Sequence, residues 1–163
     1  MARTLFQQLM AGLQYMHERG YAHRDIKAEN LLFTSSFRLK LADFGFACLL
    51  QGSSGSGVLK TWLGSQGYMA PEIESRKHYD GRRTDIFAAG VVLFIMYAGC
   101  PPFESTSVTD PFYRLIREKR FNIFWKVHSR RRTPDFFSEP FKDLIQSLLA
   151  FDPNERLTAF QVK

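Results

Sequence analysis

The sequence predicts one mainly α-helical domain of the α+β class, with a single small β-hairpin among its helices. Three patterns predict this fold: an apolar stripe with helical spacing near the N-terminus, alternation with a period of two over 31–41, and two further apolar segments near 85–98 and 141–149. A chain of 163 residues can bury a sizeable core in one domain, and a hydrophobic content of 45% is typical of a globular protein.

The first helix is predicted from apolar residues at offsets of three and four. Leu5, Leu9, Leu13 and Met16 share one face of such a helix. Gly20 follows at the position where a glycine commonly ends a helix. We therefore expect a helix that packs one side on the core and ends near residue 19.

The hairpin is predicted over 31–41. The apolar run Leu31–Phe33 is followed by the small polar turn "TSS", and Leu39 and Leu41 then alternate with basic residues. Residues 45–69 show no sustained period and contain "GSSGSG" (52–57), which predicts a long loop that is either functional or disordered.

The longest uncharged run, 86–103, contains about 15 residues before its prolines, whereas a helix needs about 20 to cross a membrane. We expect a buried core helix there and no membrane interaction. A polar, basic stretch is expected to about 133, then a helix over 141–149 and a turn at "FDPNER". Thr158 could cap a last helix that the chain barely starts.

The positive charge of the chain is concentrated in residues 114–132. This window contains eight basic residues and one glutamate, a net charge of +7, so the rest of the chain, which is +6 in total, carries −1. Cys48 and Cys100 are isolated and suggest neither a disulfide nor a zinc site. Without a signal-peptide pattern, the sequence favours a soluble, cytoplasmic protein.

Polar side chains gather where the hairpin begins and ends. Asn30 precedes the first strand and Asp43 follows the second, so an antiparallel hairpin brings them together at its open end. Asp25 lies in the loop that leads into the hairpin, with Lys27 between it and Asn30. Oxygen ligands of this kind suit Mg²⁺ that is held jointly with phosphate oxygens.

Three motifs in this region resemble the eukaryotic protein kinase family: "HRDIKAEN" (23–30), "DFG" (43–45) and "APE" (70–72) occur in the family's order and spacing. The resemblance covers essentially the whole chain and implies transfer of the ATP γ-phosphoryl group to serine or threonine hydroxyls of a protein substrate. It implies that Asp25 is the catalytic base, that Lys27 steadies the transferring group, and that Asn30 and Asp43 bind Mg²⁺ and ATP. Ala28 replaces the family's usual proline at a position without chemistry.

The resemblance extends to a regulatory pair. Arg24 resembles the arginine that pairs with a phosphate on the activation loop, and Thr61 aligns with the usual activating threonine. Ser65 stands where Ser/Thr kinases normally have threonine, which keeps the hydroxyl and favours this class over tyrosine kinases. His23 is interpreted as structural, because Asp25 already supplies the base.

Other matches are structural. Glu72 and Arg156 resemble the family's buried ion pair between the loop and the helical lobe. Asp85 and Gly90 match the start of the family's central helix, although Phe87 replaces the common tryptophan.

Half of the family's nucleotide clamp has no counterpart in the sequence. No glycine-rich loop precedes "HRD", and Lys27 is the first lysine of the chain. The chain therefore resembles only the C-terminal, helical lobe of a Ser/Thr kinase: residues 1–163 are expected to form a partial kinase domain without the N-terminal lobe and the end of the last helix. "GYMAPEI" and "GCPPF" resemble the calcium/calmodulin-dependent branch. Alone, the chain is expected to have little or no activity.

Two other functions are compatible with the sequence. The chain could be a kinase-like lobe that binds substrates or partners without turnover. The basic stretch 114–132 also contains Phe121, Phe124 and Trp125, a combination found in nucleic-acid-binding proteins. We favour burial of these aromatic side chains and docking of an acidic substrate or partner on the arginines, without nucleic acid.

Overall fold

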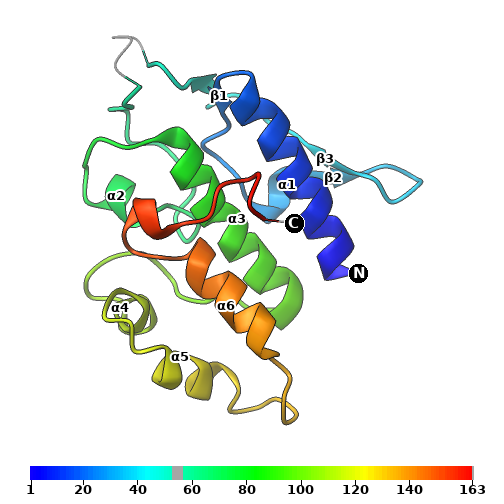
Figure 1. Cartoon of the computed structure of the whole chain (residues 1–163), viewed down its shortest axis with the longest axis vertical. Coiled ribbons are helices and arrows are strands. Elements are labelled where there is room, and N and C mark those ends of the chain that lie inside the picture. Colours follow the sequence, from blue (N-terminus) through cyan, green and yellow to red (C-terminus); the bar gives the residue numbers. More distant parts are fainter. Residues whose placement is uncertain (53–56, 163) are drawn as a thin grey trace.

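The computed structural model describes residues 1–52 and 57–162. Its elements surround one long central helix, α3 (Figure 1). The four central residues of "GSSGSG", 53–56, lie outside the described residues, as does Lys163. The helices are α1 (Ala2–Glu18), α2 (Pro71–Glu74), α3 (Gly81–Ala98), α4 (Pro111–Arg117), α5 (Phe121–His128) and α6 (Glu139–Leu148), with 3₁₀ turns η1 (Ala28–Asn30) and η2 (Pro153–Glu155); the strands are β1 (Tyr21–Ala22), β2 (Leu31–Phe33), β3 (Leu39–Leu41) and β4 (Cys48–Leu49).

Helix α1 forms where the apolar stripe predicts it. Phe6, Leu9 and Leu13 are buried along one side of the helix, which contacts α3. Gly20 has a φ of +79°, a left-handed conformation that glycine adopts without strain, and its N–H donates to the carbonyl of His17. The predicted helix and its glycine ending are confirmed.

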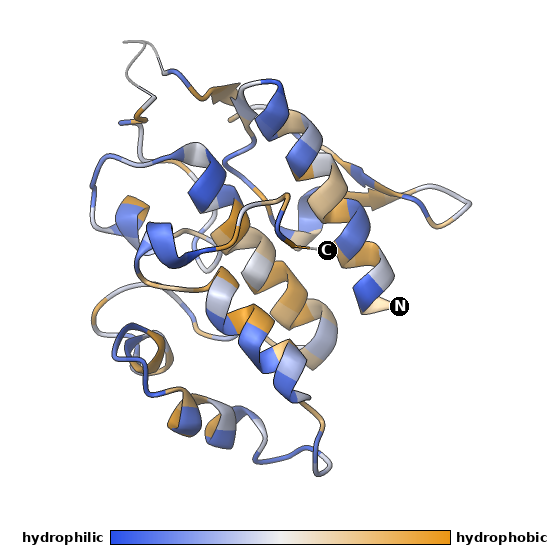
Figure 2. Cartoon of the chain, in the orientation of Figure 1, coloured by the Kyte–Doolittle hydropathy of each residue, from blue (hydrophilic) through white to orange (hydrophobic). Residues whose placement is uncertain are grey.

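Helix α3 is the predicted core helix. Asp80 caps its first turn by accepting the N–H of Arg82, and Gly99 ends it with a φ of +70°. The helix is predominantly apolar (Figure 2), and nearly all residues between Thr84 and Phe94 are buried. Helices α1 and α6 pack against it. In the described part of the chain, no helix is long and apolar enough to cross a membrane.

The predicted hairpin is formed by β2 and β3, which pair antiparallel with Leu31 opposite Leu41. It extends beyond α1 (Figure 1). The pairing continues one step past the strands, because the N–H of Ala42 donates to the carbonyl of Asn30 at 2.9 Å. A second two-stranded sheet, β1 with β4, was not expected from the sequence. Its strands have two residues each, too few to show a period.

The polar stretch before residue 133 contains two helices, α4 and α5, that the sequence analysis did not predict. Each has seven or eight residues, so an apolar face is repeated only once or twice along it. Phe124 and Trp125 are buried, as the sequence interpretation favoured, whereas Phe121 is only partly buried against the core. Thr158 caps the one turn with which the described chain ends, as expected for a helix that is barely begun. Its hydroxyl accepts the N–H of Gln161 at 3.3 Å, and the Gln161 side-chain oxygen accepts the N–H of Thr158 at 2.8 Å.

Candidate functional site

The loop that leads into the hairpin places one buried carboxylate at the centre of a polar cluster. Asp25 is 5% exposed, and its Oδ2 lies 2.7 Å from the Lys27 ammonium and 3.1 Å from the amide nitrogen of Asn30. Its other oxygen, Oδ1, accepts a hydrogen bond from the Ser65 hydroxyl at 2.8 Å. The Lys27 ammonium also donates to the Ser65 hydroxyl at 2.9 Å. Four predicted site residues therefore contact one another.

These contacts set the charge of the cluster. Burial by itself would raise the pKa of Asp25, but hydrogen bonds from Lys27, Ser65 and Asn30, together with the Lys27 charge, outweigh it and lower the pKa. The hydrogen bond to Asp25 in turn raises the pKa of Lys27. Both groups are therefore ionised at neutral pH.

The loop is held from below by Asp85, a buried carboxylate on α3. Asp85 Oδ2 accepts the backbone N–H of His23 at 2.9 Å, and its Oδ1 accepts that of Arg24 at 2.7 Å. Nε2 of His17 on α1 lies 2.9 Å from the same Oδ2. Arg24 has a φ of +67°, a conformation that costs a non-glycine residue energy and persists where its surroundings fix it. The Asp85 clamp fixes the backbone just before Asp25.

His23 has a structural environment, in line with its interpretation from the sequence. It is fully buried, and its Nε2 lies 3.1 Å from the carbonyl of Ala42 beyond the hairpin. Its Nδ1 accepts the N–H of Asp25 at 3.3 Å. The ring therefore connects the two ends of the predicted site.

The two predicted metal ligands lie at the open end of the hairpin. Asn30 is buried, and its amide nitrogen donates to the backbone and side-chain oxygens of Asp25, so the described hydrogen bonds leave its amide oxygen for another partner. Asp43 is exposed, has a φ of +59° and accepts the N–H of Gly45 at 3.2 Å. An amide oxygen and a carboxylate fit Mg²⁺. Within the described residues, no group of three His, Cys, Asp or Glu side chains could hold a metal ion.

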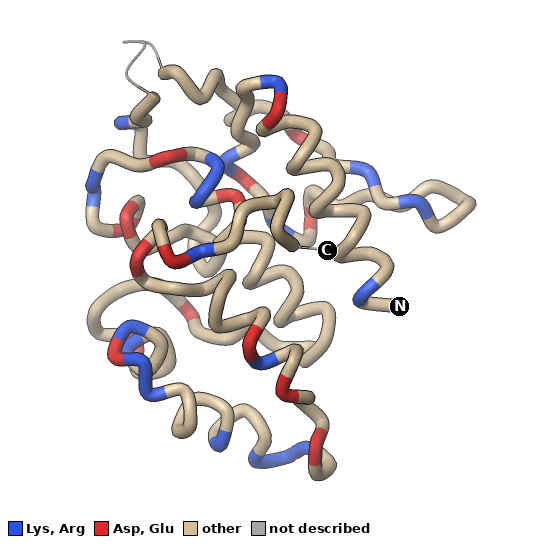
Figure 3. The backbone as a smooth tube through the Cα atoms, in the orientation of Figure 1, with Lys and Arg blue, Asp and Glu red and all other residues tan. Residues whose placement is uncertain are grey.

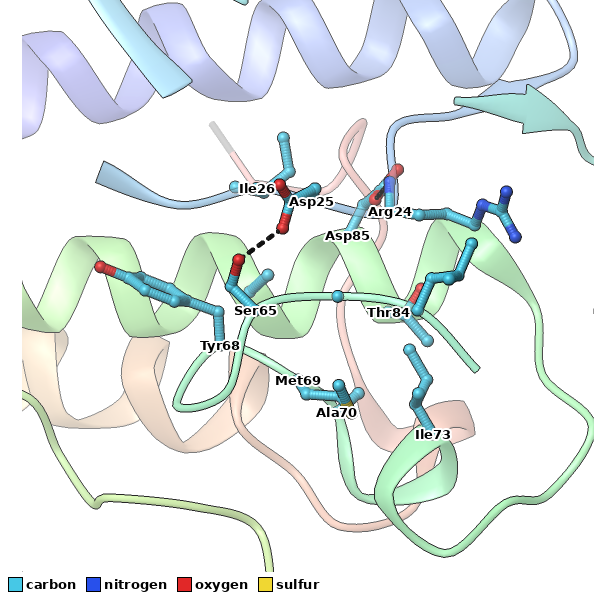
Figure 4. A pocket seen from close by; sticks show the side chains of 13 residues that line it. Arg24, Asp25, Ile26, Ser65, Tyr68, Met69, Ala70, Ile73, Thr84 and Asp85 are labelled. Atoms are coloured by element: carbon cyan, nitrogen blue, oxygen red, sulfur yellow. Dashed lines mark hydrogen bonds between the residues drawn. The ribbon is translucent and has the colours of Figure 1, made fainter. Parts of the chain in front are cut away.

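The segment 63–70 runs beside this loop and in front of α3, and the three line one pocket (Figure 4). The Ser65 hydroxyl points at Asp25, and Tyr68, Met69 and Ala70 line the same pocket. A hydroxyl group can thus be held next to the carboxylate by a backbone that α3 supports.

Arg24 and Thr61 are connected through Tyr79. The Tyr79 hydroxyl donates to the carbonyl of Thr61 at 2.6 Å and accepts from Nη1 of Arg24 at 3.4 Å. Thr61 is exposed, and it lines a pocket of about 400 Å³ together with Arg24 and Lys60. The predicted phosphate acceptor and the predicted phosphate-binding arginine therefore lie on one pocket.

Glu72 and Arg156 meet away from this site, below the segment 63–70. Nη1 and Nη2 of Arg156 donate to the two carboxylate oxygens of Glu72 at 2.6 and 2.8 Å. Both residues are buried.

Three residues important for this geometry were not assigned these contacts from the sequence: Asp85 as a backbone clamp, His17 as its partner and Tyr79 as a bridge. A carboxylate within an apolar helix is a signal for a buried hydrogen-bonding role, and it could have identified Asp85. No sequence signal marks His17 or Tyr79, because their partners come from distant segments.

Comparison with known proteins agrees with these motifs. The chain is 39% identical over 162 residues to CBL-interacting protein kinase 11 of Oryza sativa subsp. japonica, covering 99% of this chain and 30% of that protein. It is 39% identical over 157 residues to CBL-interacting serine/threonine-protein kinase 5 of Arabidopsis thaliana, covering 96% of this chain and 33% of that protein. The chain thus spans about a third of the length of these relatives.

The protein kinase domain family matches residues 1–163, the whole of this sequence. With its helices and small β-hairpin, and with relatives among Ser/Thr kinases, the chain belongs to the protein kinase family.

Proposed function

We propose that this chain carries the catalytic loop of a Ser/Thr protein kinase that transfers the ATP γ-phosphoryl group to protein hydroxyls. The observation that carries the proposal is the position of Asp25, a buried, ionised carboxylate that accepts a hydroxyl hydrogen bond from Ser65 while Lys27 lies against it. A carboxylate that already binds one hydroxyl is suited to orient another for attack.

In this proposal Asp25 accepts the hydrogen bond, and then the proton, of the substrate hydroxyl. Lys27 supplies positive charge beside the oxygens of the transferring group. Ser65 fixes the distance between Asp25 and the segment 63–70, against which the substrate chain would lie. Asn30 and Asp43 would hold Mg²⁺ together with ATP. ATP would supply the phosphoryl group, and Mg²⁺ would balance its negative charge.

We further propose that Thr61 is an activating phosphorylation site. The proposal is supported by the exposure of Thr61 and by the pocket that it shares with Arg24 and Lys60, which place two cations near its side chain. A phosphate there can form charge-assisted hydrogen bonds with the Arg24 guanidinium.

The chain is proposed to be the helical lobe of the domain, of the calcium/calmodulin-dependent-kinase-like type, completed by an ATP-gripping lobe elsewhere in the protein. Large apolar side chains on the hairpin and beside Asp43 support a covering partner: Phe37 is 75% exposed, and Leu32 and Phe44 are more than half exposed. The relatives of this chain are named as CBL-interacting kinases.

The test is a kinase assay on the protein encoded by the complete native transcript, with Asp25→Asn and the matched control Glu29→Gln. Glu29 is an exposed neighbour that makes no described hydrogen bond or ion pair. Asp25→Asn is expected to reduce phosphorylation of serine or threonine about a hundredfold or more, and Glu29→Gln is expected to preserve turnover.

Removal of Mg²⁺ by a chelator is expected to stop the reaction. Wild-type-like activity of Asp25→Asn would refute the assignment of the base. A transcript without an ATP-gripping segment, and a product without activity, would favour the alternative of a non-catalytic binding lobe.

A further inference from the structure

The structure divides the basic stretch 114–132 into a part whose charge is partly compensated by acidic side chains and a part whose charge is not compensated. In the first part, Arg114, Arg117 and Arg120 surround the carboxylate of Glu118 at 3.8, 4.0 and 3.6 Å. Lys119 pairs with Glu155 on η2 at 2.8 Å. Two carboxylates, those of Glu118 and Glu155, therefore lie at ion-pair distance from these four cations and offset part of their charge.

Arg132 is used within the fold. Its guanidinium donates to the carbonyl of Ala98 at the end of α3, and it lies 4.8 Å from the centre of the Phe136 ring. It also lies 3.8 Å from the sulfur of Cys100. This arginine anchors the segment after α5 to the core and is not a free surface charge.

Lys126, Arg130 and Arg131 remain. All three are exposed, and no carboxylate within the described ranges lies at ion-pair distance from any of them. Lys126 lies in the last turn of α5, and Arg130 and Arg131 follow in the turn that leaves the helix. Figure 3 shows this basic run at and beyond the end of α5; Asp135 is the next acidic residue.

The neighbouring aromatic side chains decide which kind of partner fits. Phe124 is 1% and Trp125 6% exposed, and both pack against the Phe94 ring of α3. They offer no face on which a nucleotide base could stack. The same burial removes the apolar face of α5 from contact with lipid, since an interfacial helix must insert such a face. Apart from Val127, which is 39% exposed, the exposed side chains of α5 are polar or cationic.

We propose that Lys126, Arg130 and Arg131 form a docking surface for an acidic protein segment, a run of aspartate and glutamate side chains. The three cations follow one another from the last turn of α5 into the turn after it, which matches carboxylates distributed along an extended chain. The arginine forks can each bind a carboxylate through two hydrogen bonds. Binding at this docking surface needs no phosphoryl transfer. A binding experiment therefore tests it independently of the proposed kinase activity.

The experiment measures binding of a fluorescein-labelled polyglutamate peptide to the 163-residue chain by fluorescence anisotropy. The test variant is K126Q/R130Q/R131Q, and the matched control is R114Q/R117Q/R120Q, which removes the same charge from the partly compensated part. The test variant is expected to bind roughly tenfold more weakly, from three exposed pairs of modest strength, and the control less than about threefold. Added salt should weaken binding to the wild type.

Circular dichroism of both variants establishes that the substitutions leave the fold intact, which their exposure predicts. Equal losses in the two variants would show that only overall charge matters and would overturn the proposal, as would unchanged binding in the test variant. A labelled oligothymidylate gives the third outcome. If the oligothymidylate binds more tightly than polyglutamate at the same salt, and this binding is lost in K126Q/R130Q/R131Q, the surface binds nucleic acid. The assignment to an acidic protein segment is then wrong.

Discussion

Glu72 and Arg156 are 84 positions apart in the sequence, yet their side chains form a buried ion pair joined by two hydrogen bonds. Arg156 has no other acidic partner within the described residues and also donates to the carbonyl of Ala150. The pair ties α2, and with it the segment 63–70, to the turn after α6. Removal of one partner would leave a charge buried without compensation.

Glu72→Gln is therefore expected to lower the free energy of unfolding by about 3–5 kcal/mol. Urea denaturation measures this change. The matched control is Lys119→Gln, which breaks the exposed Lys119–Glu155 pair and is expected to cost less than about 1 kcal/mol. Similar losses in both variants would mean that burial does not distinguish the two pairs.

Substitution by alanine is expected to have opposite effects on stability at Gly90 and at Gly12. A Cβ at Gly90 would lie 2.8 Å from Cβ of Leu148 on α6, so Gly90→Ala must push two packed helices apart and is expected to destabilise the fold by about 1–3 kcal/mol. At Gly12 on α1 the nearest atom is the end of the flexible Leu41 side chain at 3.2 Å. Gly12→Ala is expected to be neutral or stabilising by up to about 1 kcal/mol, because alanine favours the helix. Thermal unfolding compares the two.

The lowered pKa of His128 predicts that the folded protein loses stability on mild acidification. Burial among the rings of Phe94 and Phe124 lowers the pKa of His128 more than its hydrogen bond to the Pro102 carbonyl raises it, and the Arg132 charge lowers it further. The folded state thus binds this proton more weakly than the unfolded state. The stability that neutral His128 contributes is complete above the usual pKa of 6.5 and is lost as the pH falls through the lower folded pKa.

Urea titrations of the wild type and of His128→Gln test this expectation. The free energy of unfolding of the wild type should decrease more steeply than that of the variant between about pH 7 and about pH 5. Parallel curves would show that His128 titrates alike in both states.

Thr61 and Arg24 are expected to act as one unit in the complete protein. Thr61→Ala and Arg24→Gln should each reduce activity, and the double variant should lose little more than the single variants, since both remove the same phosphate contact. Kinase assays and phosphopeptide mapping measure the two effects. An unmodified Thr61 in active protein, with a harmless Thr61→Ala, would contradict the proposal.

Much of this protein could be predicted from local patterns. The stripe of α1, the apolar run of α3 and the alternation of the β2–β3 hairpin are set by the period at which apolar side chains repeat, and each was predicted. The hairpin also implied that Asn30 and Asp43 would lie near each other, because an antiparallel pair brings residues just outside its strands together.

Other features depended on contacts between distant segments. Helices α4 and α5 are too short for a clear period, and β1 and β4 each have two residues. The Asp85 clamp on the loop before Asp25 and the Tyr79 bridge between Arg24 and Thr61 join residues 18 to 62 positions apart. The sequence determined which side chains are available and which helices bury them; the tertiary structure decided which charges are paired, because ion pairs and buried hydrogen bonds require distances that only the packed chain sets.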